Sequence, residues 1–487
     1  MNKQEAAIKY ITENYLDYRR LRHDIVADKL QVRMEKPTPA PSLKGGELSS
    51  QRMSFPLGED LGEAVWREMT KHDINSIVCH CAQEYDANIT SREVMTALQS
   101  DLIPDVHPLR EYVLSCGEWT EEQPDWIDWV AQQVRVRESA TDRCEAPVDR
   151  HFVAVDGRSA APVVFHNEST ASNASELQCS ASETNYSEPR ERSKTDRLWR
   201  VCFKKWFVAM VASWMKDEVV NHQVLVLIGK QGIFKTTWLE HLIPPHLRAY
   251  ACKLANSNDL NKDERLRIAE FGLISLDEID SMNNRELNQL KSVITATDVN
   301  ERAAYAYTKE RRVRLASFCA SGNRRDFLTD ITGNRRWLPF EVEEIQNPFY
   351  TILPYERMYA QAWALAQDPL FSYWFELDEI EVLEQHNQHF RDESNEEQLL
   401  PILFDVPAEG KGEFMTTAQI SERLVTYGNI KKPMALGRLG VLMGSMGYRS
   451  VTRGNRQARL RGWIVYQRDT EEIAANKKLL AKECVTV

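Results

Sequence analysis

The sequence predicts a wound α/β domain at the centre of a chain of 487 residues. Three observations predict it. Apolar strand-like segments alternate with helical segments between about residues 196 and 345, which is the pattern of a parallel sheet covered by helices. One of these strands leads through a glycine-containing loop into a helix at 224–237. Another apolar strand ends in two acids, Asp277 and Glu278.

Composition places the chain among globular proteins. Hydrophobic residues make up 43% and charged residues 27%, and the length predicts several domains. No apolar run approaches the ~20 residues that cross a membrane, and residues 1–15 lack the features of a signal peptide. Nine scattered cysteines indicate reduced thiols, and we interpret 79–81 (Cys-His-Cys) as a buried helix segment rather than a metal site. We therefore expect a cytoplasmic protein with no membrane partner.

Changes in periodicity and composition divide the chain into five parts. They are a helical N-terminal domain (1–137), a Ser/Thr-rich linker or insertion (138–195), the α/β domain (196–345), a helical extension (346–405) and a basic, winged-helix-like domain with a C-terminal tail (406–487).

The loop at 229–237 has the order of residues that a triphosphate requires. Backbone N–H groups cradle the phosphates, Lys235 reaches the outer ones, and Thr236 contacts Mg²⁺. The residues that we expect to bind ATP are Gly229, Lys230, Gln231, Gly232, Ile233, Phe234, Lys235, Thr236 and Thr237. A chance strand–turn–helix with a surface lysine is the alternative.

Phe234 departs from the usual form of this loop, because it occupies the place of a second glycine before the lysine. A residue other than glycine keeps its N–H directed at phosphate if its φ stays negative. The departure bears on the shape of the loop and little on the role of Lys235.

Acids at the end of a buried strand need a cation or a reacting water nearby. We expect Asp277, together with Thr236, to hold Mg²⁺, and Glu278 to polarise the attacking water. Asp280 is a substitute acid or, as we prefer, the N-cap of a helix over 284–294.

Two later segments complete the set of catalytic candidates. The apolar strand before Asn323 presents this amide where a sensor would orient the water near the γ-phosphate. Arg335 and Arg336 suit an arginine finger that acts across a subunit boundary. The alternative for Asn323 is an ordinary turn residue, and the alternative for the two arginines is a solvated basic turn.

Two basic regions are candidates for DNA contact. Alternation over 299–314 predicts a β-hairpin, and its aromatic and basic residues suit single-stranded DNA, although an exposed hairpin without this role is the alternative. Residues 412–468 contain ten bases and two acids, a local +8 in a chain of −11, which is typical of phosphate-backbone binding, although a solvated basic face is the alternative. The named candidates are Tyr307, Lys309, Arg311, Arg312, Arg453 and Arg456.

Taken together, these motifs resemble the virulence-associated protein E family, the helicase-like ATPases of phages, satellites and integrative elements. The resemblance rests on 18–20 (Tyr-Arg-Arg), 107–119, the helix around Trp206, the loop at 229–237, 276–278, 321–323 and 332–336. It implies an AAA+ fold of the superfamily 3 helicase type and a hexameric ring. It also implies that ATP and Mg²⁺ are the cofactors and that single-stranded or origin DNA is the partner.

We therefore expect an ATP-dependent helicase or replication-initiation motor. A P-loop enzyme that acts on a small molecule is one alternative, and the basic C-terminal domain counts against it. A DNA-binding regulatory or defence ATPase, acting as a nucleotide switch without unwinding, is the other.

Overall fold

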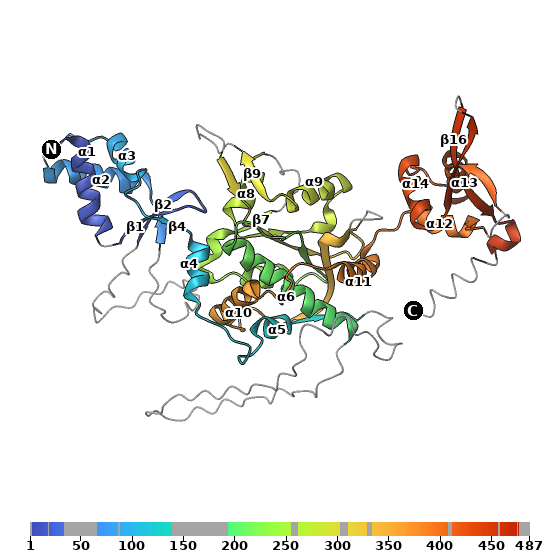
Figure 1. Cartoon of the computed structure of the whole chain (residues 1–487), viewed down its shortest axis with the longest axis horizontal. Coiled ribbons are helices and arrows are strands. Elements are labelled where there is room, and N and C mark those ends of the chain that lie inside the picture. Colours follow the sequence, from blue (N-terminus) through green and yellow to red (C-terminus); the bar gives the residue numbers. More distant parts are fainter. Residues whose placement is uncertain are drawn as a thin grey trace, which may run out of the picture.

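Figure 1 shows the chain in a computed structural model. The structure describes residues 2–17, 19–33, 66–85, 88–138, 193–254, 262–301, 310–328, 334–407, 412–455, 458–474 and 476. Nearly all of the expected linker at 138–195 therefore lies outside the described residues. No helix among the described ranges is long and apolar enough to cross a membrane.

A mixed α/β domain forms the centre of the molecule, as the sequence predicts. Its six-stranded sheet has the order β5-β12-β6-β11-β8-β7, in which β5 is antiparallel to β12 and the other neighbours are parallel. The strands are β5 (Val134–Val136), β12 (Trp337–Ile345), β6 (Val224–Ile228), β11 (Ser317–Gly322), β8 (Leu273–Leu276) and β7 (Ala251–Leu254).

Helices cover both faces of this sheet, which is why β6 is apolar at every position. Leu225 and Leu227 belong to one core cluster, and Val224, Val226 and Ile228 to the other. The first cluster includes residues of α4 (Pro108–Ser115), α5 (Trp126–Ala131), α6 (Lys194–Met215), α7 (Lys235–His241), α10 (Tyr355–Gln367) and α11 (Leu377–Asn387). The second includes residues of α8 (Lys262–Glu270) and α9 (Asn284–Ile294).

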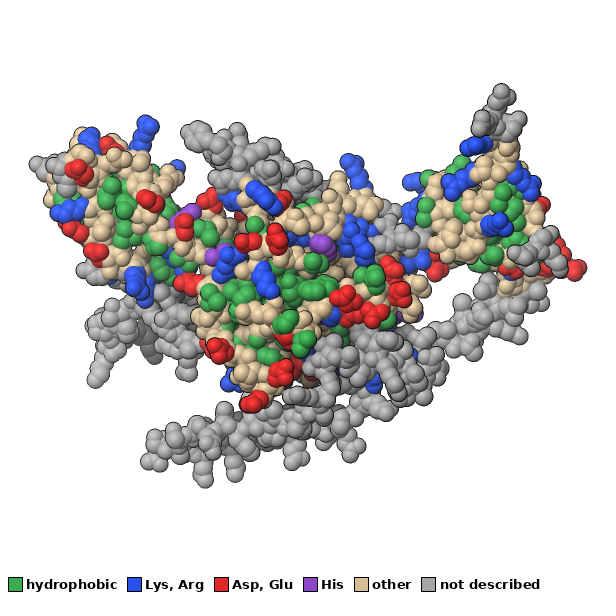
Figure 2. Space-filling view, in the orientation of Figure 1, with side chains coloured by type: hydrophobic (Ala, Val, Ile, Leu, Met, Phe, Trp, Pro, Cys, Tyr) green, Lys and Arg blue, Asp and Glu red, His purple; other side chains and the backbone are tan. Residues whose placement is uncertain are grey.

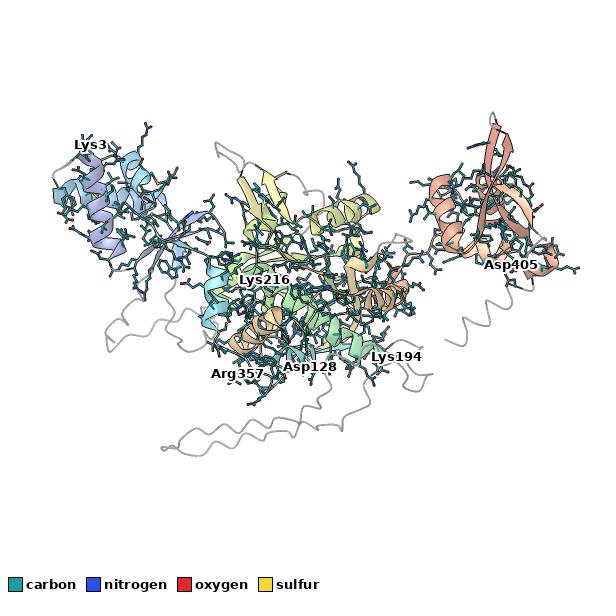
Figure 3. All side chains as sticks on the ribbon, viewed as in Figure 1. Lys3, Asp128, Lys194, Lys216, Arg357 and Asp405 are labelled. Carbon is teal, nitrogen blue, oxygen red and sulfur yellow. The ribbon has the colours of Figure 1, made fainter. Side chains whose placement is uncertain are left out.

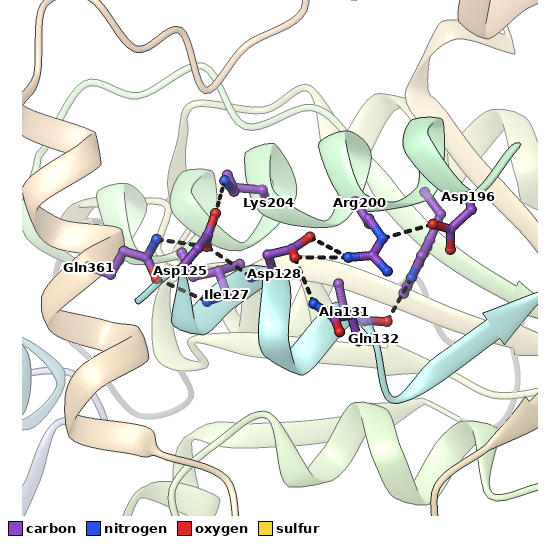
Figure 4. Close-up of polar contacts among 10 residues, drawn as sticks. Asp125, Ile127, Asp128, Ala131, Gln132, Asp196, Arg200, Lys204 and Gln361 are labelled. Carbon is purple, nitrogen blue, oxygen red and sulfur yellow. Dashed lines mark hydrogen bonds and ion pairs between the residues drawn. The ribbon is translucent and has the colours of Figure 1, made fainter. Parts of the chain in front are cut away.

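The segment 107–136 belongs to this central domain, which differs from the expected boundary at 137. Strand β5 extends the sheet, and α5 is held against α6 and α10 by polar contacts (Figure 4). Asp125 contacts Lys204 and accepts a hydrogen bond from Gln361 (2.8 Å), while Asp128 pairs with Arg200 (2.8 Å). The pairing of β5 with β12 could not be predicted from the sequence, because β5 has only three residues.

The N-terminal unit contains a sheet as well as helices. Its helices are α1 (Lys3–Ile11), η1 (Thr12–Leu16), α2 (Lys71–Tyr85) and α3 (Ser91–Leu98); its strands are β1 (Leu21–Asp24), β2 (Lys29–Arg33), β3 (Trp66–Glu68) and β4 (Asp105–Val106). Thr90 and Glu93 form a capping box at the start of α3. The contacts that join this unit to the centre include a hydrogen bond from Tyr250 to buried Asp24 (2.5 Å) and an ion pair between Arg312 and Asp28 (2.9 Å).

The C-terminal unit begins earlier than residue 406, because α12 supplies part of its core. Leu400 packs with Leu424, Leu442 and Trp463 in one buried cluster. The elements are α12 (Asn395–Leu403), β13 (Phe404–Asp405), β14 (Glu413–Thr416), α13 (Thr417–Gly428), α14 (Leu436–Ser445), β15 (Arg449–Asn455) and β16 (Ala458–Gln467). Strands β15 and β16 form an antiparallel hairpin that projects from the unit (Figure 1).

Candidate nucleotide site

Three strand ends meet at one edge of the central sheet. Strand β11 pairs with both β6 and β8, so the residues that follow these three strands are neighbours. They are the loop 229–234, the acids after Leu276, and Asn323. Because ligands of open α/β sheets bind outside the carboxyl ends of the strands, this edge is the candidate site.

The loop 229–234 needs glycine at two places. A Cβ on Gly229 would lie 2.7 Å from the carbonyl oxygen of Val342, and Gly232 has a φ of +86°. Phe234 then precedes α7 with a φ of 66° and a ψ of 17°, in the left-handed region. The condition of a negative φ at Phe234 is therefore not met: the loop keeps the conformation that glycine adopts, at a cost of about 1–2 kcal/mol for a residue with a Cβ.

Contacts between aromatic rings accompany this strained residue. The rings of Phe234 and Phe349 lie edge to face with centroids 6.4 Å apart, and Phe349 also contacts His241 at 5.5 Å. Phe349 is 67% exposed, and it lies in the connection between β12 and α10. The phenyl ring of the loop is thus covered on one side by the chain that leaves the sheet.

Lys235 is buried, with 7% of its surface exposed, and its Nζ holds the loop closed. It donates hydrogen bonds to the carbonyl oxygens of Gly229 (2.8 Å) and Lys230 (2.7 Å), and to Oδ1 of Asn323 (3.3 Å). Burial lowers the pKa of Lys235, and the charges of Asp280 and Asp277 oppose that shift.

Oxygen atoms from three strand ends gather beside Lys235. Oγ of Ser321 donates to Oδ1 of Asp277 (2.8 Å) and lies 2.9 Å from Oγ1 of Thr236, which is 3.3 Å from the same carboxylate oxygen. Hydroxyl and carboxylate oxygens of this kind are the ligands that Mg²⁺ prefers. The expected pair of Thr236 and Asp277 thus lies together, and the structure adds Ser321.

Lys253 on β7 neutralises the other carboxylate oxygen, with Nζ 2.9 Å from Oδ2 of Asp277. Burial by itself would raise the pKa of Asp277, but hydrogen bonds from Lys253, Ser321 and Thr236 hold it below the usual range. The same bond to Asp277 raises the pKa of Lys253. At neutral pH this site therefore presents an ionised carboxylate.

The two neighbouring acids have different surroundings. Glu278 is exposed at the sheet edge, with a left-handed φ of 53°. Asp280 accepts hydrogen bonds from the backbone N–H groups of Asn323 (3.2 Å) and Arg324 (3.1 Å). The preferred role of Asp280 as a helix cap is wrong, because Asn283 caps α9; Asp280 instead fixes the backbone that carries Asn323.

Arg335 and Arg336 lie at the opposite edge of the sheet. They form η6 (Asn334–Arg336) directly before Trp337, which pairs with Val224 at the start of β6. Five residues of strand separate that edge from the loop, or roughly 16 Å. Burial and the charge of Arg335 lower the pKa of Arg336, and among the described residues its buried Nε has no hydrogen-bond partner.

The DNA-contact candidates are separated in space. Strands β9 (Asp298–Glu301) and β10 (Glu310–Val313) form the expected hairpin, whose tip, with Tyr307 and Lys309, lies outside the described residues. Exposed Arg311 pairs with Asp298, whereas Arg312 is mostly buried against the N-terminal unit. Arg453 is exposed on β15, and Arg456 lies outside the described residues.

Sequence reasoning assigned no role to Ser321 or Lys253. Ser321 had a usable signal, because it is a polar residue two positions before Asn323 and follows the apolar run Phe318–Ala320. Lys253 had none, because a lysine in a short edge strand is ordinarily a solvated residue.

Comparison with protein families agrees with these features. Residues 190–398 match the model of the virulence-associated protein E-like domain. This part of the chain is a virulence-associated protein E-like domain. The match confirms the family resemblance for the motifs within 190–398, which include the three strand ends and both arginines of η6, whereas the segments 18–20 and 107–119 lie outside it. The virulence-associated protein E-like domain therefore contains every described residue of the candidate site.

Solved structures give weaker similarities. The apo structure of the NrS-1 C-terminal region (305–718) has a TM-score of 0.38 and 8% identity, over 95% of this chain and 100% of that chain. An A-form apo structure of the same region has a TM-score of 0.36 and 9% identity, over 93% and 98%. Similarity at this level does not establish a shared fold. A search of curated proteins returned no match.

Proposed function

We propose that this protein is an ATP-dependent DNA motor, a helicase or replication-initiation ATPase of a phage, satellite or integrative element. One observation carries the proposal: four side chains that follow the ends of three strands converge within hydrogen-bond distance. They are Lys235, Thr236, Asp277 and Asn323. Buried polar groups are costly unless they serve a ligand or one another, and this set matches the groups that phosphoryl transfer requires.

Each residue then has a definite task. Lys235 exchanges its bonds to the loop carbonyls for bonds to the outer phosphates of ATP. Thr236 and Asp277 hold Mg²⁺, and Lys253 releases Asp277 for this purpose. Glu278 polarises the attacking water, and Asn323 orients that water near the γ-phosphate.

Arg336 acts on a neighbouring copy of the chain in this proposal. It lies at the edge of the sheet remote from Lys235 of its own chain, and its guanidinium has a buried nitrogen without a hydrogen-bond partner in the part of the chain that the structure describes. Copies arranged head to tail would bring this edge to the nucleotide edge of the next subunit, which is the geometry of a ring. The proposal includes a homo-oligomer, with a hexameric ring as the expected form.

ATP hydrolysis tests the proposal. The purified wild type and Lys235→Ala are compared with and without single-stranded DNA, at concentrations where rings form. Turnover that DNA stimulates and that Lys235→Ala abolishes supports a motor, and a strand-displacement assay follows. Absence of turnover in the wild type under all these conditions would contradict it.

A nucleotide switch without unwinding is the second candidate, and the left-handed Phe234 favours it. Strain in the phosphate-binding loop is stored energy that nucleotide binding can release, so the loop can couple occupancy to conformation. ATP turnover that is independent of DNA, with no strand displacement, would favour this candidate over the motor.

A further inference from the structure

We propose that the C-terminal unit is a winged helix that binds double-stranded DNA across α14 and the β15–β16 hairpin, with little preference for base sequence. This inference deepens the proposed function by naming the form of DNA that the unit holds. The charge and geometry that carry it are independent of the nucleotide site.

The order of elements is that of a winged helix. Helix α12 is followed by the two-residue strand β13 and then by β14, α13, α14, β15 and β16, and the three strands β14, β16 and β15 are antiparallel neighbours. Helix α14 is seated by Leu439, Leu442 and Met443, which are all fully buried. A helix of this kind presents its outer face to the major groove, and the hairpin serves as the wing.

Strand register shows which wing residues share a side with α14. Trp463 is buried at 5% exposure, and its ring lies against Gly440 and Gly444 of α14. Side chains alternate along β16, so Arg461 and Arg459 are on the same face as Trp463, but farther toward the tip. A hydrogen bond from Arg461 to Ser450 (3.2 Å) confirms this alternation across the pair.

The opposite face of the wing carries two more arginines. Arg449 and Arg453 alternate with Ser450 and Thr452 on β15, and both are exposed. The guanidinium of Arg453 lies over the ring of Phe414 at 4.8 Å, which fixes its position. Both faces of the hairpin therefore carry cations, as phosphates on either side of a groove would require.

Cations also flank α14, and acids are sparse near it. Lys431 and Lys432 are exposed in the connection that leads to α14, and Arg438 is exposed on its first turn. In the described part of 412–468, the acids are Glu413 and Glu422. Figure 2 shows the resulting blue side chains over the wing and the body of this lobe.

The outer face of α14 offers few groups that could read bases. Its exposed positions are Leu436, Gly437, Arg438, Val441, Gly444 and Ser445. Ser445 donates its hydroxyl to the carbonyl of Leu442 in the helix itself, and Val441 is 54% exposed. Specific readout depends on several donors and acceptors at base edges, so a helix with one arginine and bare glycines fits a groove by shape.

Binding of the full-length chain to labelled DNA tests this inference. Fluorescence anisotropy is measured at several salt concentrations with a duplex, a second duplex of unrelated sequence, and a single strand. The variant is Arg459→Ala combined with Arg461→Ala. Arg468→Ala is the control, because Arg468 pairs with Asp405 at the other end of β16, roughly 23–30 Å from these arginines by strand rise. Figure 3 labels Asp405 at that end of the unit, away from the wing.

We expect the double variant to bind duplex at least about tenfold more weakly, and its slope of log affinity against log salt to be smaller by about 2. Arg468→Ala should keep the wild-type slope, and the two duplexes should bind within about threefold of each other. Wild-type duplex affinity in the double variant would overturn the proposal. So would an equal loss of single-strand binding, or a sequence motif selected from a random duplex library.

Failure of this inference is distinguishable from failure of the proposed motor. Lys235→Ala should abolish hydrolysis and leave duplex affinity within about threefold of the wild type. If the wild type lacks ATPase activity but the wing variant loses duplex binding, the motor fails and the duplex surface stands. If hydrolysis is intact but the wing variant binds duplex normally, the motor stands and the duplex surface fails.

Discussion

Nζ of Lys235 lies 3.3 Å from Oδ1 of Asn323, although the two residues are 88 positions apart in the chain. The contact exists because β11 enters the sheet between β6 and β8, and because Asp280 holds the backbone of Asn323 in place. The amide of Asn323 is thus fixed relative to the loop 229–234.

Asn323→Ala should separate binding from hydrolysis. We expect the ATP turnover rate to fall about 10- to 100-fold, because a preorganised hydrogen-bonding group near the reacting water is lost. ATP affinity should stay within about threefold, because Lys235 keeps its charge and its loop contacts. Steady-state kinetics and nucleotide-binding titration check this, with the thermal midpoint as the control for folding. Unchanged turnover would exclude a role for this amide.

Arg336→Ala and Lys235→Ala should each be inactive alone and should recover activity when mixed. A subunit with intact Lys235 can then lie next to one with intact Arg336, at about a quarter of the interfaces in a head-to-tail ring. ATP turnover of the 1:1 mixture checks this. The matched control mixes Lys235→Ala with a chain that carries both substitutions, and it should recover nothing. Arg335→Ala tested in the same way determines which arginine reaches across.

Substitutions of Phe234 should reveal the strain in the loop. Phe234→Ala removes the contact with Phe349 but keeps a Cβ at φ 66°, whereas Phe234→Gly removes both. Relief of about 1–2 kcal/mol of strain, less the ~0.5–1 kcal/mol entropic cost of glycine, should make the glycine variant more stable than the alanine variant by about 0.5–1 kcal/mol. Denaturant unfolding of both variants measures the difference. An alanine variant that is the more stable one would rule out strain.

Asp125→Asn should destabilise the protein at neutral pH and not at low pH. Burial of Asp125 alone would raise its pKa, but the charge of Lys204 and hydrogen bonds from Lys204, Asp128 and Gln361 lower it. A depressed folded-state pKa contributes stability above the unfolded value of about 3.9, and this stability is lost as pH falls through the folded pKa.

The free energy of unfolding should fall by about 1–3 kcal/mol in Asp125→Asn near pH 7, and this loss should shrink below about pH 4. Unfolding measured from pH 7 to pH 3 checks it. Asp217→Asn is the control, because Asp217 pairs with Arg110 with 71% of its side chain exposed, and should change little at any pH. A loss that stays constant with pH would mean that the charge of Asp125 does not contribute.

Local signals in the sequence were sufficient to predict the long helices and strands and the candidate residues at the ends of strands. Buried strands such as β6 read as continuous apolar runs, and Thr90 or Thr416 marked helix starts by their own capping boxes. Alternation also located the hairpin of β9 and β10. In each case the signal and the structure lie within a few neighbouring residues.

Relationships between distant segments could not be predicted in this way. Nothing in β11 itself indicates that it pairs on both sides, and the three residues of β5 carry no mark of joining a sheet with β12. Asp280 was misassigned because its partners, the N–H groups of Asn323 and Arg324, are more than forty residues away. The left-handed φ of Phe234 could not be predicted either, because residues with a Cβ rarely adopt that conformation.

The contacts of Asp24 and Asp28 have a mechanical consequence. Arg312 stands at the base of the β9–β10 hairpin and grips Asp28, while Tyr250, just before β7, is bonded to Asp24 inside the same small sheet. A movement of this hairpin therefore either breaks these two contacts or moves the described part of the N-terminal unit with it. The N-terminal unit is thus connected to the hairpin. A force on this unit is transmitted to β7, the strand that pairs with β8 just before Asp277.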